Sequence, residues 1–120
     1  MPTRTPPDER IALLQGTLDL LILRILLFGH EHGQGIARAI QAMSGDELLV
    51  DHGSLYPALQ RLETKGWVAG EWGTSGNNRK ARFYRLTPGG KKQFATETKQ
   101  WDRIAAAVGR VLAVEKPICD

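Results

Sequence analysis

The chain has 120 residues, enough for one domain with a hydrophobic core of its own. A single cysteine, Cys119, excludes a fold that depends on internal disulfides. The net charge of +3 is unevenly distributed, because residues 53–92 contain eight Lys/Arg and only two Glu. Such a basic segment is typical of a surface that binds a polyanion, although chance clustering on a solvated hairpin is the alternative.

Residues 1–10 are polar and contain three prolines, so we expect a flexible N-terminal arm. They show no signal-peptide pattern, which favours a cytoplasmic protein. The apolar segment that comes next predicts a helix over 18–28, capped by Thr17 and ended by Gly29.

This helix is shorter than the roughly 20 apolar residues of a membrane span, and it contains Asp19 and Arg24. We therefore expect no membrane insertion. A helix that is apolar nearly all round is buried on more than one side. In so small a domain, part of it is expected to meet a second subunit, through Leu18, Leu21, Ile22 and Ile25.

Residues 29–33 are predicted to be a connection, in which two histidines flank Glu31. With His52 they would supply three metal ligands, but the spacing matches none of the zinc arrangements. We expect surface histidines and no metal. Apolar residues at helical spacing then predict a helix over 34–43, and the apolar run 48–50 predicts a short strand that joins a later hairpin as its third member.

The next helix is predicted over 54–65, with Ser54 or Gly53 as its cap, Pro57 in its first turn and Gly66 beyond its end. One face is apolar, and the other carries donors and cations without a carboxylate. An ordinary amphipathic surface helix would look the same, so the interpretation of this helix depends on the residues C-terminal to it.

Two strands are predicted over 67–72 and 79–87, joined by the turn-rich residues 73–78. Four of the first seven residues of the second strand are basic: Arg79, Lys80, Arg82 and Arg85. A helix followed by a cationic hairpin is the layout of a winged helix-turn-helix, in which the helix enters the major groove of DNA. Trp67 and Trp72 border this hairpin, and we interpret both as core or hinge packing.

A long helix is predicted from residue 91 to 114, with apolar residues spaced as in a short heptad seam. The seam either closes the core of its own domain or pairs with a second subunit, and we favour a homodimer. Its expected interface residues are Phe94, Trp101, Ile104, Ala105, Val108, Val111 and Leu112.

The predicted fold is therefore mostly α with a small antiparallel β wing. It comprises an arm (1–10), a winged helix-turn-helix domain (11–90), a C-terminal dimerisation helix (91–114) and a tail (115–120). The sequence contains no phosphate loop, no nucleophile with a partner and no cluster of metal ligands. We therefore expect neither catalysis nor a cofactor.

Several segments resemble the signature of PadR-like transcriptional regulators, in the same order along the chain. The likeness covers residues 13–114, and the matching segments are 16–23, 32–37, 53–59, 61–63, 66–67 and 78–90. Two departures are mild: Phe83 stands where tyrosine is common, and Gln60 stands where histidine often occurs. The second could change which base is read.

The resemblance implies a winged-helix dimer in which the C-terminal helix packs against the N-terminal helix of the partner. It also implies a repressor of adjacent operons, and many such proteins respond to small molecules. Trp101 on the seam either packs in the interface or forms a wall for a flat aromatic ligand.

In such a dimer the two copies of the helix over 54–65 would enter successive major grooves, about 34–36 Å apart. The operator should therefore be an inverted repeat. Gln60 would read adenine and Arg61 guanine. Ser54 and Tyr56 would either read bases or hold phosphates, and the wing would either bind phosphates or enter the minor groove. The expected DNA-binding residues are Gln34, Ser54, Tyr56, Pro57, Gln60, Arg61, Lys65, Asn77, Asn78, Arg79, Lys80 and Arg82. The alternative is a protein-interaction module of the same fold that binds an acidic protein.

Overall fold

A computed structural model describes residues 11–12 and 15–115 of the chain. The predicted arm (1–10) and most of the predicted tail (116–120) lie outside the described residues. The helices are α1 (Gln15–Leu26), α2 (Gly33–Met43), α3 (His52–Thr64) and α4 (Pro88–Ala113). The strands are β1 (Ile11–Ala12), β2 (Glu31–His32), β3 (Leu48–Leu49), β4 (Val68–Thr74) and β5 (Lys80–Leu86).

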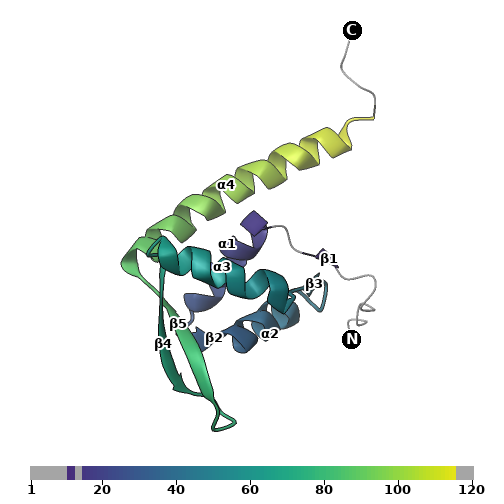
Figure 1. Cartoon of the computed structure of the whole chain (residues 1–120). Coiled ribbons are helices and arrows are strands. Elements are labelled where there is room, and N and C mark those ends of the chain that lie inside the picture. Colours follow the sequence, from purple (N-terminus) through teal and green to yellow (C-terminus); the bar gives the residue numbers. More distant parts are fainter. Residues whose placement is uncertain (1–10, 13–14, 116–120) are drawn as a thin grey trace.

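Helices α1, α2 and α3 pack around one apolar core, and the β4–β5 hairpin and α4 leave this core in opposite directions (Figure 1). The residues with the least exposed side chains come from all three helices and from the first position of β4: Leu18, Ile22, Leu23, Ile36, Leu55, Leu59, Leu62 and Val68. The predicted fold class, a winged helix-turn-helix with a small antiparallel sheet, is confirmed.

The wing is a three-stranded sheet with the order β2–β5–β4. Its hairpin pairs Val68 with Leu86 at the base and Thr74 with Lys80 at the tip. The third strand is Glu31–His32, which pairs with Tyr84 and Phe83 of β5. The prediction that residues 48–50 supply the third strand is therefore wrong, because Leu48–Leu49 instead pairs in parallel with Ile11–Ala12.

The ends of two helices differ from the prediction. Helix α1 begins at Gln15, so Thr17 lies inside the helix and does not cap it. Helix α3 is capped by Asp51, whose side chain accepts a hydrogen bond from the Ser54 amide at 2.9 Å. Asp51 takes the capping position because its carboxylate can accept from the free amides of the first turn. Gly66 follows α3 with φ = 77°, as predicted for the residue that ends the helix.

Three of the residues expected at a dimer interface, Leu18, Ile22 and Ile25, are buried in the core of their own chain, at 7 % exposure or less. Within the single chain these three side chains are covered, because α1 packs on α2, α3 and α4. Leu21 and Phe94 are partly buried against the same core.

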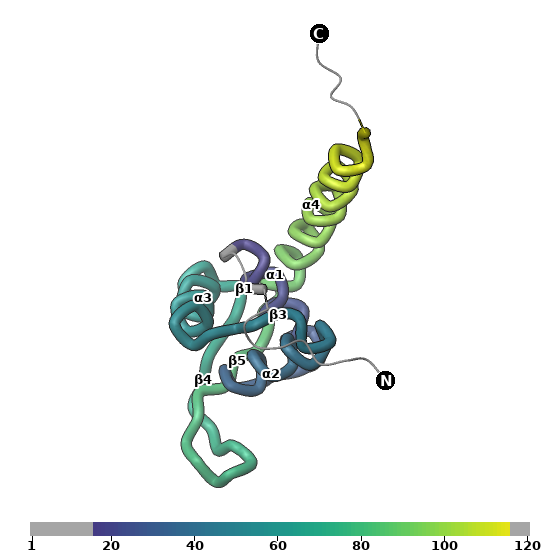
Figure 2. The backbone as a smooth tube through the Cα atoms, turned by 90° about the vertical axis from the view of Figure 1, so that its right-hand side faces the viewer, coloured from purple at the N-terminus to yellow at the C-terminus, as the bar shows by residue number. Residues whose placement is uncertain are grey.

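The C-terminal half of α4 extends beyond the core (Figure 2). Its apolar side chains are exposed by about half or more: Trp101 47 %, Ile104 55 %, Val108 50 %, Val111 73 % and Leu112 79 %. Ala105 on the same side is half-buried. No helix in the described part of the chain has both the length and the apolar character to cross a membrane.

Candidate nucleic-acid interface

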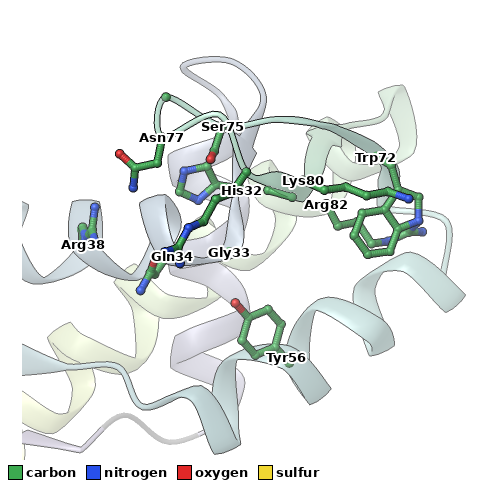
Figure 3. Close-up of a pocket in the computed structure, with 13 residues that line it drawn as sticks. His32, Gly33, Gln34, Arg38, Tyr56, Trp72, Ser75, Asn77, Lys80 and Arg82 are labelled. Carbon is green, nitrogen blue, oxygen red and sulfur yellow. The ribbon is translucent and has the colours of Figure 1, made fainter.

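A groove of about 500 Å³ lies between the start of α2, the first half of α3 and the tip of the wing (Figure 3). Four of its lining residues are Arg or Lys and none is Asp or Glu, so the groove is suited to an anion. It is lined by His32, Gly33, Gln34, Arg38, Tyr56, Trp72, Ser75, Gly76, Asn77, Arg79, Lys80, Ala81 and Arg82.

His32 forms the α2 side of the groove as a helix cap. Its Nδ1 accepts a hydrogen bond from the Gly35 amide at 3.0 Å, which satisfies one of the free amides of the first turn of α2. The edge of its ring meets Phe83 of β5, with ring centroids 5.5 Å apart. His32 therefore joins the start of α2 to the wing. From the sequence, only a surface histidine is expected at this position.

Tyr56 forms the α3 side of the groove, and its hydroxyl points into it (Figure 3). The ring covers Gly33 so closely that a Cβ added there would lie 2.8 Å from a ring carbon. The ring of His52 meets it edge-on at 5.7 Å. Tyr56 is thus held in one place by both helices while 45 % of its surface stays exposed.

Trp72 forms the wing side of the groove and is 62 % exposed, so its interpretation as core or hinge packing is wrong. It lies opposite Arg82 in the hairpin register, in the half of the hairpin nearer the tip. The Lys80 Nζ lies 5.1 Å from the centre of its ring. An aromatic face beside a cation is suited to a sugar–phosphate backbone.

Arg82 connects the wing to α3. Its Nη2 donates to Oε2 of Glu63, and the guanidinium lies over Gly70, where an added Cβ would come within 2.8 Å of it. The guanidinium also lies 5.9 Å from the ring of Tyr84, whose phenol has a pKa raised by burial. The charge of Arg82 is therefore shared with a carboxylate, whereas Arg79 and Lys80 have exposed side chains.

The tip of the wing is a tight turn from Ser75 to Arg79. The Ser75 amide donates to the Arg79 carbonyl at 2.8 Å, and the Asn78 amide donates to the Ser75 carbonyl at 2.9 Å. Asn78 adopts φ = 57°, which asparagine tolerates better than most residues. Asn78 therefore shapes the turn, while Asn77 and Arg79 line the groove.

The second half of α3 lies outside the groove and lines a shallow hollow of about 390 Å³, made by Pro57, Gln60, Arg61, Thr64 and Lys65. Gln60 and Lys65 are exposed there. Arg61 instead points toward α1, where its Nη2 donates to Oδ1 of Asp19 at 2.9 Å. The Ser54 hydroxyl donates to Oδ2 of Asp51 at 3.2 Å, so it supports the helix cap.

A model of the transcriptional regulator PadR-like family matches residues 22–96. The chain belongs to the PadR-like family. It is a DNA-binding transcriptional regulator and not an enzyme. The resemblance seen in the sequence is therefore confirmed.

Several known proteins are similar to this chain in structure or in sequence. A PadR family transcriptional regulator from Eggerthella lenta is similar in structure, with 27 % identity, a TM-score of 0.71, and coverage of 84 % of this chain and 86 % of that chain. A transcriptional regulator from Clostridium thermocellum is 25 % identical, with a TM-score of 0.73 and coverage of 80 % and 93 %. An uncharacterized protein of Lysinibacillus sphaericus is 28 % identical over 95 residues, which are 79 % of this chain and 87 % of that protein.

Not all the groove residues of this PadR-like chain were found from the sequence. Gln34, Tyr56, Asn77, Arg79, Lys80 and Arg82 were expected at a DNA-binding surface, but His32, Arg38, Trp72 and Ser75 were not. Arg38 lies one helical turn after Gln34 on α2, so the spacing could have indicated it. Strand alternation could have placed Trp72 on the face of Lys80 and Arg82.

Proposed function

We propose that this PadR-like regulator is a cytoplasmic homodimeric repressor that binds an inverted-repeat operator and is released by a small flat ligand. The observation that supports it most is the groove, which has four cations and no carboxylate among its lining residues. The groove lies where α3 meets the wing, so a DNA strand following it would place α3 in the neighbouring major groove.

In this arrangement the wing and the start of α2 hold the phosphate backbone. Arg38, Arg79 and Lys80 supply exposed charges, and the amide group of Gln34 supplies a further donor. The hydroxyl of Tyr56 donates to a phosphate from the α3 side. These contacts fix the position of α3 but do not themselves read the base sequence.

Homodimerisation is supported by the exposed apolar side of α4. Five large apolar side chains, from Trp101 to Leu112, lie on this side without a covering element in the described chain. Heptad-like spacing of this kind pairs helices by burying such a stripe. A second copy of the chain, whose α4 carries the same stripe, is the partner that we propose.

Ligand release is supported by a hollow of about 390 Å³ between the start of α1 and the middle of α4. Trp101 forms one wall, beside Leu20 and Glu97. An aromatic wall of this kind suits a flat molecule. Occupation of the hollow would change how α1 and α4 pack, and thereby the spacing of the two α3 helices.

The proposal is tested by a gel-shift assay with the DNA upstream of the protein's own gene, in the presence of excess non-specific competitor. Specific retardation that depends on an inverted repeat is expected. Absence of retardation, together with recovery of an acidic protein partner, would instead support a protein-interaction module.

Gln60→Ala is expected to relax the base preference at one position of each operator half-site. Gln60 is exposed on α3, and a bidentate amide–adenine pair contributes roughly 1–3 kcal/mol of discrimination. Binding-site selection on the variant measures this directly, with Thr64→Ala, one turn away on the same hollow, as the control. An unchanged motif would remove Gln60 from the base-reading residues.

Arg79→Ala combined with Lys80→Ala is expected to weaken binding to every DNA sequence, roughly tenfold to a hundredfold. Both side chains are exposed in the groove, and each phosphate contact adds about 0.9 to the salt slope. The slope of log affinity against log salt should therefore flatten by up to about two units. The control is Lys91→Ala with Lys92→Ala, which removes the same charge from exposed positions outside the groove. Equal slopes for the two double variants would exclude the wing from the contacts.

A further inference from the structure

Arg61 and Asp19 form an ion pair that joins α3 to α1 across 42 positions of sequence. The Arg61 Nη2 lies 2.9 Å from Asp19 Oδ1, and the side chains are 32 % and 14 % exposed. The Arg61 Nε is buried and has no hydrogen-bond partner within the described residues. The guanidinium is therefore turned into the α1–α3 contact, although the sequence places Arg61 on the polar side of α3.

Burial limits what the pair can add to the stability of the fold. Burial raises the pKa of the Asp19 carboxyl above its ordinary value, although the charge and hydrogen bond of Arg61 lower it. A raised pKa means that ionisation of Asp19, which occurs as the pH rises, is less favourable in the folded chain than in the unfolded chain. Ionisation of Asp19 at neutral pH therefore stabilises the folded chain less than the unfolded one, so the pair is weak evidence for a purely stabilising role.

The surroundings of the pair show what it can do. Two other charged groups act on Asp19, Glu97 of α4 and Lys65 at the C-terminal cap of α3, so the carboxylate lies where three helices meet. On α3, Arg61 follows Gln60, which is exposed toward the proposed major-groove surface. The side chain that anchors α3 to α1 is thus next to the one that we expect to read a base.

We propose that Asp19 and Arg61 are a positioning pair that fixes the orientation of α3 on α1, and that Arg61 does not itself contact a base. This inference rests on the proposed function, in which α3 reads the operator. It replaces the sequence-based prediction that Arg61 reads guanine. A paired guanidinium has one fixed geometry, so it sets the angle of α3 more narrowly than apolar contacts alone.

Asp19→Ala distinguishes a positioning role of Arg61 from a base-reading role, because the two roles predict opposite changes in operator affinity. Loss of a positioning contact should weaken operator binding roughly twofold to thirtyfold, while binding to unrelated DNA changes little. A base-reading Arg61 would instead be freed by the same substitution, and operator binding would tighten. Asp102→Ala, which removes a carboxylate from an exposed position of α4, controls for the change in net charge.

Arg61→Gln and the double variant complete the test. If the pair acts as a unit, the double variant should bind the operator at least as tightly as whichever single variant binds it less tightly. Its salt slope should equal that of the wild type. A slope reduced by about one unit in Arg61→Gln, with relaxed preference at one operator position, would overturn the proposal. Should Asp19→Ala fail to fold, the double variant, which leaves no unpaired charge, is compared with Arg61→Gln.

Hydrogen exchange distinguishes failure of this inference from failure of the proposed function. The amides of α3 should exchange faster in Asp19→Ala than in the wild type, whereas those of α2 should not. This measurement needs no DNA. Unchanged exchange in α3 would overturn the positioning pair even if the wild type binds its operator, and faster exchange would support it even if no operator is found.

Discussion

A Val108→Glu protein is expected to be monomeric in solution and to lose operator binding. Val108 lies in the middle of the exposed apolar side of α4, with 50 % of its surface free in the single chain. A symmetric dimer contains the substitution twice, so two carboxylates would be buried without a partner. Since an unpaired buried charge costs several kcal/mol, the dimer dissociation constant should rise roughly a hundredfold or more.

Analytical ultracentrifugation over a range of protein concentrations measures this change, and a gel shift on the same samples measures operator binding. Ala106→Glu is the matched control, because Ala106 is exposed on the other side of the same helix. It should leave both measurements unchanged. A Val108→Glu protein that still sediments as a dimer would show that the pairing surface lies elsewhere.

Gly90→Ala is expected to lower the free energy of unfolding by roughly 2–3 kcal/mol, and the melting temperature by about 10 °C. An alanine inside a helix normally stabilises relative to glycine. At Gly90, however, the added Cβ would collide with the carbonyl oxygen of Trp67 and lie 2.7 Å from a methyl carbon of Leu86. The start of α4 would have to move away from the base of the wing.

That movement would disturb the hydrogen bonds of Thr87, whose amide donates to the Trp67 carbonyl at 3.1 Å and whose hydroxyl donates to the Gly66 carbonyl at 2.7 Å. Gly89→Ala is the control, because a Cβ there meets nothing closer than 3.7 Å. Gly109→Ala, in open space on α4, should instead stabilise by roughly 0.5–1 kcal/mol. Thermal unfolding followed by circular dichroism compares all three, and equal melting temperatures for the Gly89 and Gly90 variants would contradict the close packing.

The sequence predicted the elements that carry their own local signals. Apolar spacing located α2, α3 and α4 to within a few residues, and turn residues located the hairpin. It missed the pairing of two-residue strands, because Glu31–His32 is polar and too short for a periodic pattern. The apolar run at Leu48–Leu49 looked more like the missing strand, but it pairs with β1.

The same limit applies to the site. Which side of a helix is polar can be read from spacing, so Tyr56 and Gln60 were placed correctly on the exposed side of α3. Spacing cannot show which polar side chains are already paired within the chain. Arg61 pairs with Asp19, 42 positions away, and Arg82 pairs with Glu63, 19 positions away. Two of the expected DNA contacts therefore bond to other helices of their own chain.

The three tryptophans occupy three different surroundings, so the protein contains three spectroscopic reporters at separate places in the fold. Trp72 is in the groove, Trp101 is on the exposed side of α4, and Trp67 is partly buried against the core. In variants that retain one indole at a time, emission from Trp72 would report DNA binding and emission from Trp67 would report unfolding. Emission from Trp101 would report the proposed subunit pairing or ligand binding. Quenching of Trp72 alone on mixing with an oligonucleotide would locate the bound strand beside the wing without a dye or label.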